Sequence, residues 1–250
     1  MSTMSTPLLD GTGSIQMLDV FGNDLTVVNA ARVSFAKEST VITEADKKLI
    51  KYLATHGHIS PFFHPQIRLR LKMPIFVARE WFRHTIGFAR NEVSRRYVDT
   101  EPEIFLPAEL RARDPKLKQG SKSESIEDND EVVKELKHFH ASALDAYNSL
   151  LAKGVAPEVA RGVLPQNMYT EFIETGSLYA YARLCNLRLD PYAQKEIREY
   201  ATVLSDLIAP LFPASWPHLV SSAAVAAPAP AAVQTAYPTS VVPETLGVSV

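Results

Sequence analysis

The stretch IRLRLKMPIFVAREWF, residues 67–82, decides the fold. Ile67, Leu69 and Leu71 alternate with basic residues, which predicts a half-buried strand with a strongly basic outer face. Pro74 then stands where a helix would start, and the apolar run behind it predicts a packed helix. Because the expected strands and helices do not alternate regularly along the chain, we predict a mixed α+β fold rather than a doubly wound parallel sheet.

Helix signals continue on both sides of this stretch. Thr43, with Asp46 three residues later, predicts a helix that ends before Gly57. Downstream, apolar residues at steps of three and four predict a long helix over residues 131–153, which Gly154 closes.

The C-terminal half continues with a predicted strand at residues 169–175. Ser177 then suits the cap of a helix that runs to about Leu187. Asp190 and Pro191 predict the start of a last helix.

The expected domain covers residues 1–222, and two polar or proline-rich segments interrupt or follow it. Residues 116–130, KLKQGSKSESIEDND, bury almost nothing and predict a mobile surface loop. Residues 223–250 are rich in Ala and Pro, which predicts a disordered tail.

The composition limits the classes of function. With 250 residues, 46% hydrophobic and 22% charged, the chain can bury a sizeable core. A net charge of -2 gives no global basic field, so we expect no bulk attraction to nucleic acid or to a membrane. No apolar stretch suits a signal peptide or a membrane span, so we expect a cytoplasmic protein. The histidines lack a recognised metal spacing, and no metal site is predicted.

Residues 80–99, EWFRHTIGFARNEVSRRYVD, are the richest in candidate chemistry. Arg83, Arg90, Arg95 and Arg96 place four guanidiniums within fourteen residues. Arginine suits phosphate, because its planar fork donates two parallel hydrogen bonds and stays charged. A solvated surface turn with salt bridges remains the alternative.

Arg161 and Arg188 occur among apolar residues, so we expect both to be buried. A buried arginine must be paired, which makes each of them either part of a structural ion pair or a ligand-binding group.

The run KMPIFVAREWFRH followed by RNEVSRRY resembles the signature of the flavin-dependent thymidylate synthases. The segments GHISPFFH, ARGVLPQNMYT and LRLDPYAQKEI are similar to that family in the same order, and the resemblance covers about residues 20–215. There are departures. Thr85 stands where the family usually has a second arginine, and the interval to Ser94 is one residue longer. Arg90, inside the longer interval, is the candidate substitute for the flavin-phosphate contact.

The resemblance implies roles for individual residues. Arg188 is the expected catalytic group, because a guanidinium beside the uracil stabilises negative charge there. The expected dUMP contacts are Glu80, Arg83, Glu92, Ser94, Arg95, Arg96, Arg161 and Arg188. The expected FAD contacts are Ser60, Arg83, His84, Thr85, Arg90, Glu92, Ser177 and Arg183.

The same resemblance implies that reduced FAD supplies a hydride, that NADPH reduces FAD and that methylenetetrahydrofolate provides the carbon. It also implies a homotetramer. Cys185, the only cysteine, raises the question of a thiolate nucleophile, but its apolar neighbours favour a small buried side chain. The alternatives are a nucleotide- or RNA-binding module without catalysis and an NADPH-oxidising flavoprotein that does not act on dUMP.

Overall fold

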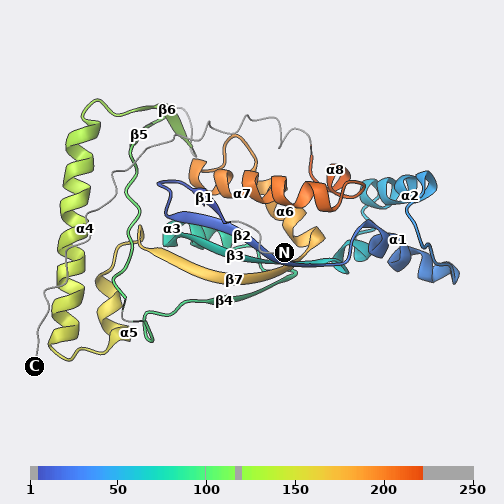
Figure 1. The fold of residues 1–250 in the computed structure, drawn as a ribbon. Helices are drawn as coiled ribbons and strands as arrows, with labels where there is room; N and C mark the ends of the chain where they lie inside the picture. The colour runs from blue at the N-terminus through green and yellow to red at the C-terminus, as the bar shows by residue number, and fades with distance from the viewer. Residues whose placement is uncertain (1–4, 99, 116–119, 222–250) are drawn as a thin grey trace, which may run out of the picture.

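The computed structural model describes residues 5–98, 100–115 and 120–221. One antiparallel sheet crosses the molecule in the strand order β1-β2-β3-β7-β4 (Figure 1). Its strands are β1 (Thr6–Leu8), β2 (Gly13–Phe21), β3 (Gln66–Pro74), β4 (Phe88–Glu92) and β7 (Tyr169–Ser177).

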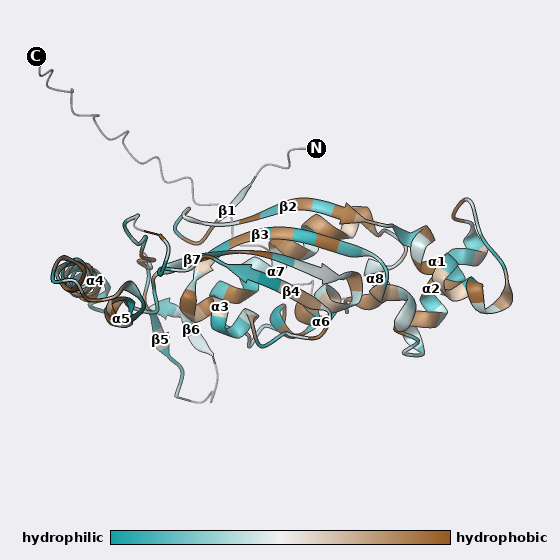
Figure 2. Cartoon of the chain, turned by 90° about the horizontal axis from the view of Figure 1, so that it is seen from below, coloured by the Kyte–Doolittle hydropathy of each residue, from teal (hydrophilic) through white to brown (hydrophobic). Residues whose placement is uncertain are grey.

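Helices cover one face of this sheet. They are α3 (Ile75–Trp81), α6 (Leu178–Arg188) and α7 (Lys195–Ile208), which pack against the strands (Figure 2). On β3, Ile67, Leu69 and Leu71 are fully buried against them. Arg68 and Arg70, between these residues, point to the other face, where they pair with carboxylates of neighbouring strands. The predicted half-buried strand with a basic outer face is confirmed.

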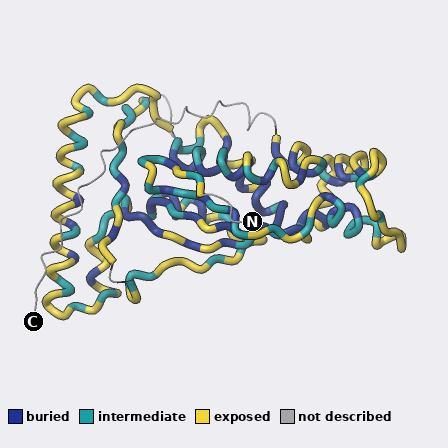
Figure 3. Tube along the Cα trace, viewed as in Figure 1, coloured by how far each residue is buried: buried dark blue, intermediate teal, exposed yellow. Residues whose placement is uncertain are grey.

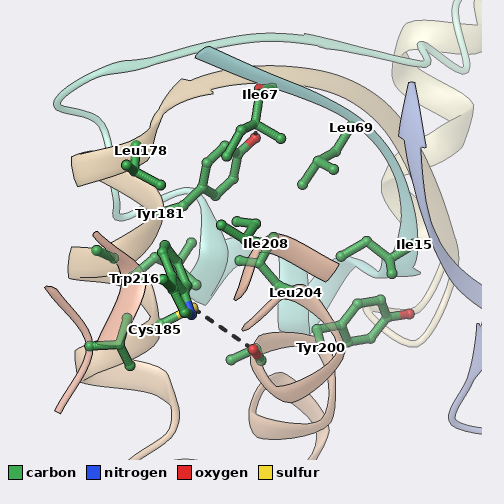
Figure 4. Close-up of a cluster of buried hydrophobic side chains, with 14 of the residues drawn as sticks. Ile15, Ile67, Leu69, Leu178, Tyr181, Cys185, Tyr200, Leu204, Ile208 and Trp216 are labelled. Atoms are coloured by element: carbon green, nitrogen blue, oxygen red, sulfur yellow. Dashed lines mark hydrogen bonds between the residues drawn. The ribbon is translucent and has the colours of Figure 1, made fainter. Parts of the chain in front are cut away.

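The core lies between the sheet and these helices (Figures 3 and 4). Four residues at helical spacing on α7, Ile197, Ala201, Leu204 and Ile208, are fully buried. Trp216 closes the cluster, and its indole N–H donates to the hydroxyl of Ser205 at 3.0 Å (Figure 4). Full burial of a side chain such as Ile or Leu stabilises the fold by about 1.5–3 kcal/mol relative to leaving it exposed.

The remaining elements lie around the sheet. Two helical groups flank it at opposite ends in Figure 1, α1 and α2 at one and α4 and α5 at the other. The elements are α1 (Asp24–Arg32), η1 (Val33–Phe35), α2 (Glu44–Thr55), η2 (Ser60–Phe63), β5 (Arg111–Arg113), β6 (Ser121–Ser125), α4 (Asn129–Ala152), α5 (Pro157–Ala160), η3 (Arg161–Val163), η4 (Ala209–Leu211) and α8 (Trp216–Leu219).

Local sequence signals explain several of these boundaries. Thr43 and Asp46 form a reciprocal capping box at the start of α2, as predicted. The hydroxyl of Ser177 accepts a hydrogen bond from the amide of Ala180 and so caps α6. The mixed α+β prediction is confirmed.

Two segments differ from what their sequence predicts. Part of the expected surface loop, residues 116–130, forms strand β6, which is exposed along its whole length and pairs with β5. Arg111 on β5 holds this hairpin to α7 through two hydrogen bonds with Glu196, at 2.7 and 3.0 Å. The helix expected to start at Asp190 and Pro191 is α7, which begins at Lys195 and is followed by α8, so it is not the last helix. Asp190 and Pro191 form a turn instead, for which Asp-Pro is equally suited. Residues 116–119 and the expected tail at 223–250 lie outside the described residues.

Candidate functional site

Arg188, at the last position of α6, is held by three hydrogen bonds. Its Nη1 donates to Oε2 of Glu80 at 3.1 Å, and its Nη2 donates to the main-chain carbonyl of Glu80 at 3.2 Å. Its Nε donates to Nε2 of His84 at 3.0 Å. These bonds use three of the five guanidinium N–H donors, and the described part of the chain gives the other two no partner. Arg188 is half-buried rather than fully buried as expected, and it forms an ion pair with Glu80, one of the two expected alternatives.

His84 lies between α3 and β4, and the charges of four arginines act on its ring. Burial, and then the positive charges of Arg188, Arg90, Arg183 and Arg83 in that order, together lower its pKa from 6.5 to about 4. At neutral pH the ring is therefore uncharged. Because its Nε2 accepts from Arg188, the proton of the neutral ring lies on Nδ1.

These four arginines and His84, which we call the His84 cluster, come from three separate parts of the chain. Arg83 follows α3, Arg90 lies on β4, and Arg183 and Arg188 lie on α6. Among the described residues, Glu80 is the only carboxylate that forms an ion pair with Arg188. A concentration of positive charge around a neutral imidazole can bind an anionic group such as a phosphate.

Arg90 contacts a buried carboxylate that the sequence did not single out, Glu174 on β7. The two residues lie directly opposite each other in the β4–β7 register, and Arg90 Nε forms an ion pair with Glu174. The guanidinium also packs against the rings of Phe82 and Phe88, with its central carbon 5.3 and 4.7 Å from their centroids. A charged residue at a core-facing position of a strand is the signal by which Glu174 could have been found.

The predicted dUMP segment lies beyond the end of β4. Val93 donates to the carbonyl of Glu171, which places the segment near the start of β7. The hydroxyl of Ser94 accepts from the main-chain N and the Nε of Arg96, at 3.4 and 3.3 Å. Arg95 donates to the carbonyl of Thr100.

Glu92 accepts a hydrogen bond from the hydroxyl of Thr170 at 2.5 Å. Within the described ranges no hydrogen bond or ion pair joins Ser94, Arg95 or Arg96 to the His84 cluster.

The other predicted site residues are placed individually. Ser60 begins η2 and is exposed, as is Thr85 in the turn after α3. Ser177 is buried, where its hydroxyl caps α6. Arg161 is exposed at the start of η3, so the prediction that it is buried is wrong. Its neighbour Val163 is itself 42% exposed, and the apolar sequence around Arg161 does not form core.

Cys185 is fully buried in the core beside Trp216 (Figure 4). Burial raises the pKa of its thiol far above the ordinary value, so the thiolate needed for nucleophilic attack does not form. The expectation of a small buried side chain is confirmed.

Two further features bear on the class of protein. Across residues 5–98, 100–115 and 120–221, no three His, Cys, Asp or Glu side chains gather in a way that could hold a metal ion. No helix in the same ranges is long and apolar enough to cross a membrane.

The sequence is similar to a family of known proteins. The family model Thy1, described as thymidylate synthase complementing protein, matches residues 16–214. The flavin-dependent thymidylate synthase of Thermus thermophilus is 38% identical over 213 residues, which are 85% of this chain and 77% of that protein. The enzyme of the same name from Thermotoga neapolitana is 39% identical over 204 residues, which are 82% and 88% of the two chains.

Solved structures give the same result. The UMP/dUMP methylase PolB from Streptomyces cacaoi, crystallised with 5-Br dUMP, has a TM-score of 0.75 and 29% sequence identity. The similarity covers 86% of this chain and all (100%) of that one. The matched region contains β3, the His84 cluster and α7, and the protein therefore belongs to the Thy1 family, the flavin-dependent thymidylate synthases.

Proposed function

We propose that the protein converts dUMP to dTMP by reductive methylation, with methylenetetrahydrofolate as the carbon donor and FAD, reduced by NADPH, as the flavin. The observation that carries this proposal is the fixed guanidinium of Arg188, with two N–H donors left over beside a neutral imidazole. The methylase neighbour crystallised with 5-Br dUMP supports a pyrimidine nucleotide as the substrate.

Arg188 is the proposed catalytic residue. Its remaining N–H donors suit carbonyl oxygens of the uracil ring, where negative charge must be stabilised for C5 to act as a carbon nucleophile. Glu80 and His84 hold the guanidinium in place, so little reorganisation is needed when that charge develops. Arg188 itself cannot act as the base, because its pKa is too high.

The nucleotide phosphate is assigned to the segment after β4. Arg95 and Arg96 supply charged forks there, and the Ser94 hydroxyl already accepts from Arg96. Glu92 and Arg161 complete the proposed dUMP contacts, together with Glu80 and Arg83. The proposal includes the homotetramer that the resemblance implies, in which sites form where subunits meet.

The flavin is assigned to the His84 cluster, whose arginines fit the negative charge of its phosphates. When bound, the flavin supplies the hydride. The proposed contacts are Ser60, Arg83, His84, Thr85, Arg90, Glu92, Ser177 and Arg183. Within this set, Ser177 orients the start of α6, and the arginines supply charge.

The test is dTMP formation by purified protein supplied with dUMP, methylenetetrahydrofolate, NADPH and FAD, with Cys185→Ala assayed alongside. Product from both proteins is expected, because the buried thiol takes no part. If folded protein that carries flavin oxidises NADPH without forming dTMP, the reductase alternative replaces this proposal. Colourless protein that binds RNA in a salt-sensitive manner would favour the binding module.

A further inference from the structure

Glu174 is a buried carboxylate in the middle of the sheet. Its side chain is completely buried (0% exposed) and shares the helix-covered face of β7 with Phe172. Such positions in a strand are ordinarily apolar, because an ion there loses its hydration. The carboxylate therefore needs compensating partners, and the fold supplies them.

Three side chains from three elements surround the Glu174 carboxylate. The indole N–H of Trp81, on α3, lies 3.1 and 3.2 Å from its two oxygens. The Nε of Arg90 forms the ion pair from β4. The hydroxyl of Tyr181, on α6, donates to the carbonyl of Ile67 at 3.5 Å and lies near enough to Glu174 to favour its charged form. Charge-assisted bonds of this kind are short and strong, so the carboxylate is a rigid anchor.

Arg90 is consequently fixed in orientation. Glu174 ties its Nε, and the rings of Phe82 and Phe88 pack against its guanidinium. Its Nη2 is buried and has no hydrogen-bond partner among the described residues. A buried N–H donor without an acceptor is unfavourable, so its position suits an acceptor that the described chain does not contain.

We propose that Glu174 is a positioning residue, which holds Arg90 so that Nη2 donates to a phosphate oxygen of the flavin at the His84 cluster. The inference rests on the proposed function, since it assigns part of the flavin site. Arg90 is among the charges that act on His84.

The experiment measures flavin and dUMP dissociation constants for purified Glu174→Gln, with folding checked by circular dichroism. Glutamine keeps the size of the side chain and one acceptor oxygen but removes the charge that orients Arg90. The matched control is Glu171→Gln, because Glu171 lies on the same strand and faces the opposite side, 3.8 Å from Arg70. We expect flavin affinity to fall about tenfold or more in Glu174→Gln, with dUMP affinity and the control within about twofold.

A double-variant cycle tests whether Glu174 acts through Arg90. Arg90→Lys keeps the positive charge but lacks Nη2, so it should lose flavin affinity, and adding Glu174→Gln should weaken binding little further. A purely structural Glu174 would instead lower thermal stability and leave the flavin affinity of the folded variant unchanged. If Glu174→Gln does not fold, Glu174→Asp, which keeps the charge but shortens the side chain so that it no longer reaches Arg90 Nε, takes its place in the cycle.

Three outcomes would overturn the inference. The first is unchanged flavin affinity in folded Glu174→Gln or Arg90→Lys. The second is a pair of losses in affinity that add fully in the double variant, and the third is a loss of dUMP affinity alone, which would assign Nη2 to the nucleotide. Failure of the unaltered protein to bind flavin would instead overturn the proposed function, and the inference with it.

Discussion

Arg188 donates its Nε hydrogen to Nε2 of His84 across 3.0 Å, so a permanently charged group and a titratable one share a hydrogen bond. The bond exists only while Nε2 carries no proton. Protonation of His84 would remove it and place two positive charges side by side, which accounts for the direction of the His84 pKa shift.

The first prediction concerns stability against pH. The pKa of His84 is about 4 in the folded protein, against 6.5 for an unperturbed histidine in the unfolded chain. Between these pH values the unfolded chain therefore binds more protons than the folded protein. The free energy of unfolding should therefore fall as pH is lowered from about 6.5 to about 4. Urea unfolding at several pH values should show a smaller fall for His84→Gln than for the unaltered protein.

The comparison between variants is needed because other groups titrate in the same range. Burial raises the pKa of Glu199 and Asp206, so these carboxyls favour the folded state as pH falls and oppose the effect of His84. His138→Gln, which removes an exposed imidazole from α4, is the matched control. Parallel curves for His84→Gln and the unaltered protein would contradict the assigned protonation state.

The second prediction concerns Arg188. In Arg188→Ala, dTMP formation should fall by at least ~100-fold with the flavin spectrum intact, because stabilisation of charge on the substrate is lost. Arg188→Lys should recover only part of the rate, since an ammonium cannot keep the three hydrogen bonds in one plane. Lys47→Ala, on an exposed ion pair of α2, controls for loss of a positive charge. Turnover within a few-fold of normal would remove Arg188 from the catalytic role.

The third prediction concerns Cys185. The buried thiol, whose pKa burial raises, should resist a thiol reagent in the native protein and react once per chain after denaturation. Cys185→Ala should lose about 1 kcal/mol of stability and keep its activity. Rapid labelling of native protein that also abolishes dTMP formation would revive the nucleophile hypothesis.

Local patterns in the sequence accounted for β3, α2 and the cap of α6, because their causes lie within a few residues. Strand β4 was not predicted, since its sequence FARNE shows no alternation of apolar and polar residues and the strand forms only by pairing with β7. The predicted burial of Arg161 failed for a related reason, because apolar neighbours become core only where another element covers them.

The residues of the candidate site also differ in how far the sequence identifies them. The arginines and His84 could be named from the sequence, since residue type and family motif identify them. For Glu174 the sequence offers only a charged residue at a core-facing position of a strand, because its importance depends on Arg90, 84 positions earlier, facing it from the neighbouring strand. Pairing between strands far apart in sequence therefore determines which charged residue holds another in place.

The fourth prediction tests this dependence through Gly176, which lies opposite Phe88 in the sheet. A Cβ at Gly176 would lie 2.5 Å from Cε1 of Phe88 and 2.8 Å from Cε2 of Tyr181, so both rings would have to move. Gly176→Ala should therefore cost about 1–3 kcal/mol of stability, measured by urea unfolding.

The same variant should also weaken flavin binding, because Phe88 packs against Arg90 and Tyr181 lies near Glu174. Gly162→Ala is the matched control, since a Cβ there would meet nothing within 4 Å. If Gly176→Ala loses stability but binds flavin as tightly as Gly162→Ala, the ring of Phe88 does not help to hold Arg90. Weakened binding in Gly176→Ala alone would instead show that close packing at a glycine sets the orientation of a charged group on the neighbouring strand.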